Sequence, residues 1–275
     1  MKIALSEIST VAVPFADDVA AYRAAGFDGI GIWEFKLPEG DDDASARLVR
    51  ESGLGVANCV PAIPTFLQLA QPGMEGPADP AERIEALCAS MARLARFEPA
   101  SIVVLTGPVG DRSEDEARSI VCEGLREVAA AARAAGVRLG LEPTHRSESH
   151  VTSFISTIGE AIALLDAAGV GDVGVMVDTV HVWDTPALAE EVALHAARVT
   201  GFHVGDKHAA GDPSRLLPGE GVTHPEELAR LLRATGFDGY LDVEIFSTPD
   251  AFWGLPADEA ARRAAAAARW LIAQS

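Results

Sequence analysis

Strand-like and helix-like segments alternate along the whole chain, eight of each in strict order, and this alternation limits the fold more than any other feature. Apolar strands that are joined through helices indicate a parallel sheet covered by helices. The predicted strands are Ile3–Ile8, Gly29–Phe35, Val56–Ile63, Ser101–Thr106, Arg138–Pro143, Val173–Asp178, Val199–Val204 and Tyr240–Phe246. The predicted helices are Pro14–Ala25, Asp43–Ser52, Pro80–Phe97, Ser113–Ala135, Ser156–Ala168, Ala187–Ala197, Pro225–Ala234 and Pro256–Ala273. Eight such units predict an α/β fold, a (β/α)8 TIM barrel that forms a single domain over residues 1–275.

Glycine and proline support this division of the chain. Gly26, Gly53, Gly136 and Gly169 each follow a predicted helix, where glycine accepts the left-handed conformation that ends a helix. The alternative is a doubly wound open sheet, which would carry a glycine-rich nucleotide turn after the first strand. That segment reads SEISTVAVPF and has no G-x-G-x-x-G pattern.

Charge and cysteine content exclude several functional classes. A formal net charge of −19 opposes binding to nucleic acid, which needs clustered lysine and arginine. No segment reaches the roughly 20 continuous apolar residues of a membrane span, and the first residues lack the pattern of a signal peptide. The three cysteines are odd in number and far apart, as expected of reduced thiols. We therefore expect a cytoplasmic protein with neither a nucleic-acid partner nor a membrane partner.

Four side chains that can bind metal follow apolar runs at or near predicted strand ends: Glu142, Asp178, His203 and Glu244. Charged groups are costly inside a barrel unless they are paired or bind metal. The four strands are neighbours in a barrel, so their carboxyl ends can direct these side chains to one point. Three carboxylates and one imidazole favour Mn²⁺, Mg²⁺ or Co²⁺. The alternative for each residue is a separate salt bridge or a satisfied core position.

Several further residues are candidates for substrate contact. His181 lies three residues after Asp178 and is either a fifth ligand or a contact to a substrate oxygen. Arg215 precedes a Pro-Gly turn in the long segment Gly205–His224 and could hold a substrate oxygen, or be a solvated cation. Other expected pocket or lid residues are Trp33, Glu34, Phe35, Phe66, Trp183, Lys207, His208, Phe246 and Trp253, with His145, Arg146 and Glu148 behind Glu142.

The chain resembles the sugar phosphate isomerase/epimerase superfamily, the xylose-isomerase-like TIM barrels, which includes ketose 3-epimerases, hydroxypyruvate isomerase and inosose dehydratase. The motifs that carry the resemblance are LEPTHR, VDTVHVW, GFHVGD, RLLPGEG and GFDGYLDVEIF. The resemblance implies a divalent metal, most often Mn²⁺, bound by Glu142, Asp178, His203 and Glu244. It also implies that Glu142 and Glu244 are the catalytic acid and base, and that His181 and Arg215 bind substrate. Homo-oligomers occur in this superfamily.

The implied activity is that of a metal-dependent sugar isomerase or epimerase. It would abstract a proton beside a keto-sugar carbonyl and pass through a stabilised enediolate. The segment DKHAAGDPS between His203 and Arg215 departs from the epimerase pattern, so the resemblance leaves the substrate open. The alternatives are a lyase on related keto-sugars, of the inosose dehydratase or 3-oxo-glycoside-cleaving type, and a non-catalytic sugar-binding barrel.

Overall fold

Eight parallel strands close into a barrel in the computed structural model, which describes residues 1–71, 73–209 and 213–275. The order around the barrel is β1-β10-β7-β6-β5-β4-β3-β2, with β10 paired to β1 to close it. The barrel strands are β1 (Lys2–Ser6), β2 (Gly29–Trp33), β3 (Gly55–Val60), β4 (Ile102–Val104), β5 (Leu139–Leu141), β6 (Gly174–Asp178), β7 (Val199–Val204) and β10 (Tyr240–Val243). The predicted (β/α)8 TIM barrel is confirmed.

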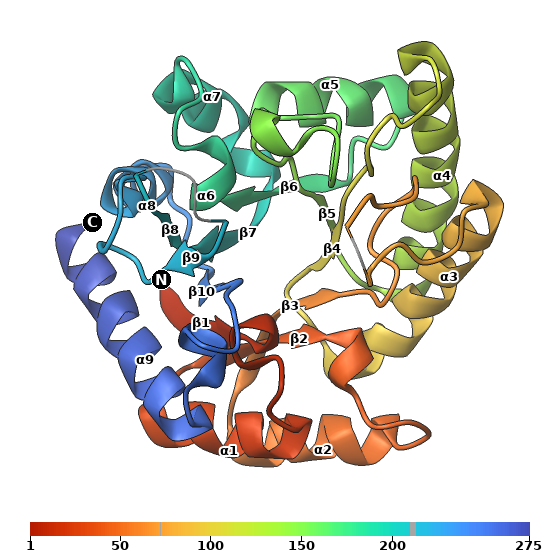
Figure 1. Cartoon of the computed structure of the whole chain (residues 1–275). Coiled ribbons are helices and arrows are strands. Elements are labelled where there is room, and N and C mark those ends of the chain that lie inside the picture. The colour runs from red at the N-terminus through yellow and green to blue at the C-terminus, as the bar shows by residue number, and fades with distance from the viewer. Residues whose placement is uncertain (72, 210–212) are drawn as a thin grey trace.

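Helices surround the barrel as an outer ring (Figure 1). They are α1 (Phe15–Ala25), α2 (Asp42–Ser52), α3 (Pro80–Leu94), α4 (Glu114–Ala135), α5 (Ile158–Ala168), α7 (Leu188–His195), α8 (Pro225–Ala234) and α9 (Ala257–Gln274), with the one-turn α6 (Thr179–Val182) after β6. No helix in the described part of the chain is both long and apolar enough to cross a membrane.

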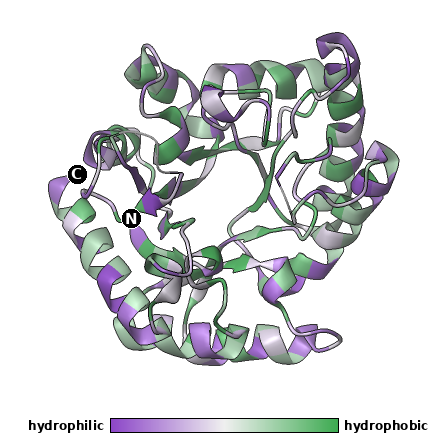
Figure 2. Ribbon diagram, viewed as in Figure 1, coloured by the Kyte–Doolittle hydropathy of each residue, from purple (hydrophilic) through white to green (hydrophobic). Residues whose placement is uncertain are grey.

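Helical periodicity explains how the ring packs on the barrel. In α4 the buried positions include Ala117, Val121, Leu125, Val128 and Ala132, which recur every three or four residues on one face. Hydrophobic residues predominate along the barrel strands, whereas the helices carry both hydrophobic and hydrophilic residues (Figure 2). The apolar core therefore lies between the strands and the inner faces of the helices.

Caps and turns set the helix boundaries. The side chains of Ser113 and Thr157 accept hydrogen bonds from backbone amides three residues later, which satisfies donors that the first helical turn leaves free. Gly136 ends α4 with a φ of 74°, as the sequence predicts. These local signals explain why the sequence predicts the helix boundaries.

Six strands end earlier than predicted. Three of them are β3, which ends at Val60 rather than Ile63, β4 at Val104 rather than Thr106 and β5 at Leu141 rather than Pro143. The first strand ends at Ser6 rather than Ile8, because Glu7–Thr10 form the 3-10 turn η1. The second strand ends at Trp33, before the turn η2 (Glu34–Lys36), and the last strand ends at Val243 rather than Phe246. The segment after β7 also contains a short antiparallel hairpin, β8 (Asp206–Lys207) with β9 (Arg215–Leu216), which the sequence does not predict.

Candidate metal centre

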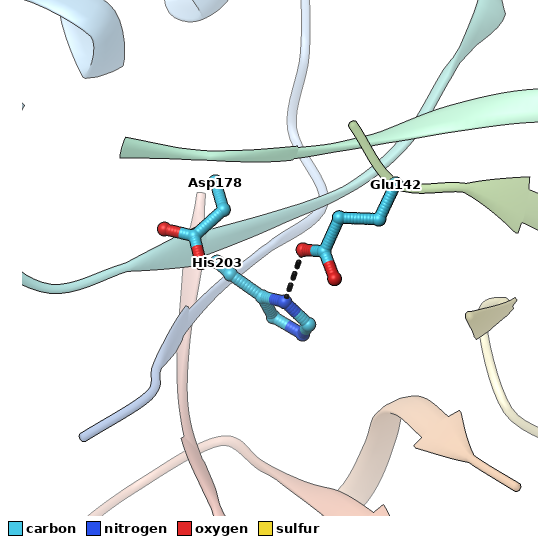
Figure 3. Close-up of side chains that lie close together, drawn as sticks. All are labelled: Glu142, Asp178 and His203. Atoms are coloured by element: carbon cyan, nitrogen blue, oxygen red, sulfur yellow. Dashed lines mark hydrogen bonds and ion pairs between the residues drawn. The ribbon is translucent and has the colours of Figure 1, made fainter. Parts of the chain in front are cut away.

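Three of the four predicted metal ligands form one compact buried group. Glu142 directly follows β5, Asp178 ends β6 and His203 lies in β7. Each offers a ligand atom, and these atoms lie within 4.8 Å of one another. His203 Nδ1 is 2.9 Å from Glu142 Oε1, and a dashed line marks this interaction in Figure 3. Two carboxylates and an imidazole in such a group can hold a divalent metal ion.

Strand register explains this convergence. Asp178 pairs with His203 across β6 and β7, and the backbone N–H of Glu142 donates to the carbonyl of Val104 in the neighbouring strand. Asp178 is further fixed because its Oδ1 accepts a hydrogen bond from Val180 N at the start of α6. Its Oδ2 is thereby left to face the centre of the site.

Glu244 lies beside this group and is held by an arginine. Its Oε2 is 3.7 Å from His203 Nδ1 and accepts a hydrogen bond of 2.8 Å from Arg215 Nη1. The same Arg215 nitrogen is 2.9 Å from Asp178 Oδ2. Arg215 is therefore an ion-pair partner of two of the predicted ligands, and it is buried rather than a solvated loop cation.

Arg215 and His181 lie next to each other at the edge of the metal-ligand group. Arg215 Nη2 is 3.2 Å from His181 Nε2, and the guanidinium lies 4.9 Å from the centre of the Phe246 ring. His181 Nδ1 accepts a hydrogen bond from the backbone N–H of His145. His181 Nε2 is 3.6 Å from Asp178 Oδ2. The two predicted substrate-binding side chains are thus brought together within reach of the carboxylates.

Burial and charge strongly perturb this group. Burial raises the pKa of Glu142 to about 7, against the opposing effect of His203. Although burial acts to lower it, the pKa of His203 is raised to about 10 by the Glu244 and Glu142 carboxylates. Burial and the neighbouring Arg215 lower the pKa of His181 to about 3, so this imidazole is neutral at physiological pH. Clustered perturbed groups of this kind are typical of functional sites.

A cavity of about 800 Å³ lies above the carboxylates, at the carboxyl ends of the strands. Its lining includes Glu142, His203 and Glu244 together with His181 and Arg215. Trp33, Trp183, Phe246 and Trp253 also line it, as the sequence predicts, and so do Lys207, His208 and Glu148. The size is within the range of small-molecule sites.

Other predicted pocket residues lie elsewhere. Glu34 accepts hydrogen bonds from Ala62 N, Ser90 Oγ and Arg93, so its carboxylate faces α3 and not the cavity. The cavity lining does not include Phe35, which is half exposed, or Phe66, which packs in the core. The placements of Glu34 and Phe35 follow from the turn η2 at the end of β2, where the sequence pattern predicts continued strand.

The predicted residues behind Glu142 are arranged around His181 instead. The side chain of His145 contacts Asp184 and stacks on Trp183 with ring centres 6.4 Å apart. Arg146 forms an ion pair with Asp184. The segment after β5 therefore fixes the wall of the cavity near α6.

The sequence prediction did not include two buried carboxylates near this site. Asp206 accepts hydrogen bonds from the backbone N–H groups of Lys207, Gly219, Gly221 and Thr223, and from the Thr223 hydroxyl. Asp242 lies in β10, where it pairs with His203 of β7. The available signal for Asp242 was its spacing of two residues from Glu244, which places both on one face of a strand.

Comparison with known proteins shows similarity at the level of a family. The family model described as xylose isomerase-like TIM barrel matches residues 19–274. A D-psicose 3-epimerase from Enterocloster bolteae is 32% identical over 136 residues, which cover 50% of this chain and only 42% of that enzyme. A putative hydroxypyruvate isomerase from Streptomyces coelicolor is 26% identical over 91% of this chain and 94% of its own length. The crystal structure of protein SMc04130 from Sinorhizobium meliloti 1021 superposes with a TM-score of 0.86 at 26% identity, covering 98% of both chains.

Proposed function

Because the chain belongs to the xylose isomerase-like TIM barrel family, we propose that it is a divalent-metal-dependent isomerase or epimerase of keto-sugars. The observation that carries the proposal is the buried group of Glu142, Asp178 and His203, with Glu244 beside it, at the floor of a cavity of about 800 Å³. Relatives named as a sugar epimerase and a putative isomerase support the reaction class.

The donor set fits a hard or borderline divalent cation. Glu142, Asp178 and Glu244 bring three buried carboxylates together around His203, and the pKa of Glu142 is raised by burial. Both features are costs that a bound cation would relieve for the carboxylates. Glu142, Asp178, His203 and Glu244 would hold the ion, with Mn²⁺ preferred and Mg²⁺ or Co²⁺ as alternatives. A bound ion would supply positive charge that stabilises the oxyanion developing on the substrate.

Glu142 and Glu244 are the proposed acid and base. They come from β5 and β10, which β6 and β7 separate in the barrel, so they can act from opposite sides of a bound ketose. One carboxylate takes the proton from the carbon beside the carbonyl, which leaves an enediolate, and the other returns a proton. Return to the same carbon from the opposite face gives an epimer. Return to the adjacent carbon, with transfer of the hydroxyl proton from one oxygen to the other, gives an isomer.

His181 and Arg215 are the proposed substrate-binding residues. Both line the cavity, and both are donors suited to carbonyl or hydroxyl oxygens. His181 Nδ1 accepts from His145 N, and its Nε2 lies 3.2 Å from Arg215 Nη2, so the neutral imidazole and the guanidinium would meet the substrate as a pair. The planar guanidinium of Arg215 orients oxygen atoms without changing its charge.

The proposal is tested by solvent deuterium exchange. Ketoses, keto-inositols and 3-oxo-glycosides are incubated with the full chain and Mn²⁺ in D₂O, and deuterium at the carbon beside the carbonyl is followed by NMR. Glu142→Gln and Glu244→Gln should each lower exchange by at least about 100-fold, the scale of acid–base catalysis. Glu34→Gln, which alters a buried carboxylate directed at α3, should retain it.

The products distinguish the alternatives. An unchanged molecular formula supports the isomerase or epimerase, whereas a dehydrated product or a released aglycone would assign a lyase. Exchange that persists in both glutamate variants would overturn the acid–base roles. Absence of exchange with every substrate class, together with sugar binding, would favour a non-catalytic barrel.

The free thiols of Cys59, Cys88 and Cys122 agree with the cytoplasmic location that we propose.

A further inference from the structure

The two ring nitrogens of His203 face different surroundings. Nδ1 is directed at Glu142 and Glu244, at 2.9 Å and 3.7 Å from their carboxylate oxygens. Nε2 is buried and has no hydrogen-bond partner among the described residues. Asp242 Oδ2 lies 3.8 Å from Nε2. Asp242 therefore lies on the side of the His203 ring that faces away from Glu142 and Glu244.

Asp242 is positioned by the barrel itself. It pairs with His203 in the register of β10 with β7 and is buried. Its Oδ2 accepts a hydrogen bond of 2.7 Å from Asn58 Nδ2, while Oδ1 has no partner in the described part of the chain. Position 31 in β2 is glycine, and a Cβ there would collide with the Asp242 carboxylate. Three strands thus accommodate this carboxylate beneath His203.

We propose that Asp242 is a positioning residue that makes Nδ1 of His203 the metal-binding nitrogen; this inference rests on the metal site of the proposed function. A neutral imidazole carries one proton, so a ring that binds metal through Nδ1 must carry its proton on Nε2. Asp242 Oδ2, 3.8 Å from Nε2, is the acceptor that we assign to that N–H in the metal-bound protein. A carboxylate in this position also makes the imidazole a stronger ligand.

Asp242 acts from outside the substrate cavity. It is absent from the lining of the 800 Å³ cavity and instead lines a second cavity, of about 570 Å³. The lining of that second cavity includes Gly239 and Val199, which precede or begin β10 and β7, so it opens toward the amino-terminal ends of the strands. Substitutions of Asp242 can therefore change the affinity for the metal ion without removing a contact to the substrate.

The test is the affinity of the full, metal-free chain for Co²⁺, measured by titration calorimetry. Asp242→Asn keeps an acceptor and loses the charge, so it should weaken Co²⁺ binding by about 10-fold. Asp242→Ala loses both and should weaken it by about 100-fold, the upper range for removal of such a partner. Glu34→Gln is the matched control, because it neutralises a buried carboxylate that contacts neither His203 nor Asp242, and it should bind like the wild type.

A second measurement needs no variant of Asp242. In the ¹⁵N-labelled wild-type chain loaded with Zn²⁺, a long-range ¹H–¹⁵N spectrum should show the His203 proton on Nε2, assigned by loss of the signals in His203→Asn. A proton on Nδ1, or Co²⁺ affinities of both Asp242 variants within twofold of wild type, would overturn the inference. A wild type that binds no divalent ion would instead refute the proposed metal dependence.

Discussion

Two opposing influences act on the protonation of the Glu142 carboxyl. Burial favours the protonated form and raises the pKa of the carboxyl to about 7, while the adjacent His203 favours the ionised form. His203 itself is held in its charged form by Glu244 and Glu142, with a pKa of about 10. Without a cation the site therefore retains protons that a metal ion would have to displace.

These protons predict how the stability of the metal-free chain depends on pH. Glu142 binds a proton more tightly folded than unfolded, so folding is increasingly disfavoured as pH rises from the unfolded value near 4.5 through about 7. His203 adds the same sign, because its stabilisation is complete below pH 6.5 and is lost as pH rises toward about 10. Urea denaturation in EDTA should show the free energy of unfolding falling between pH 6 and pH 9.

The variant Glu142→Gln separates this effect from the general acidity of the chain. It lacks the titrating carboxyl, so its decline between pH 6 and pH 7 should be shallower than that of the wild type. Parallel profiles for the two proteins would show that the pKa of Glu142 is not raised by folding.

The hairpin of β8 and β9 is the element that brings Arg215 back to the site. Asp206 and Leu216 pair across the hairpin, as do Lys207 and Arg215, and Arg215 N donates to the carbonyl of Phe246. The carboxylate of Asp206 accepts hydrogen bonds from the backbone N–H groups of residues 219, 221 and 223, in the turn that follows the hairpin. One buried side chain thus fixes the loop that carries Arg215, the proposed substrate-binding arginine.

Asp206→Asn should loosen this loop. An amide cannot accept all the hydrogen bonds that the carboxylate accepts, and hydrogen bonds to charged groups contribute roughly 1.5–3 kcal/mol each. We expect faster hydrogen exchange at Gly219, Gly221 and Thr223 and a fall of at least about tenfold in kcat/KM. Asp172→Asn removes an exposed partner of Arg133 and should change neither. Unchanged exchange in the Asp206 variant would contradict the role of this carboxylate.

A feature of this structure is predictable from the sequence when the residues that produce it lie close together in the chain. Helices and barrel strands were predictable because their hydrophobic periods and glycine ends are local. Glu34 was misplaced because the turn after Trp33 directs it toward Ser90 and Arg93, which are distant in sequence. Asp206 and Asp242 were missed because their partners come from other strands and turns. Residues at strand ends could be predicted, whereas the contacts that orient them could not.

At the scale of the whole molecule the candidate site joins four neighbouring strands. The side chains come from the ends of β5, β6 and β10 and from within β7, while β10 also pairs with β1 to close the barrel. A ligand that binds all four strands only when they are folded stabilises the entire barrel.

Metal removal should therefore lower the melting temperature. A divalent ion at about 100 times its Kd contributes about 2.7 kcal/mol, which corresponds to roughly 5–10 °C for a domain of this size. Scanning calorimetry with Co²⁺ and with EDTA measures the difference. His203→Gln should abolish it, whereas His224→Gln alters an exposed histidine and should preserve it. Equal melting temperatures with and without the ion in the wild type would contradict a metal bound by the folded barrel.

The pairing of β10 with β1 also has a consequence for protein synthesis. The ribosome makes β1 first and β10 only after seven other barrel strands, so the barrel cannot close until both are available. Asp242 and Glu244 leave the ribosome with that last strand, long after Glu142 and Asp178. A nascent chain consequently cannot complete the proposed metal site before the last barrel strand is made, so completion of that site and closure of the barrel become possible in the same step.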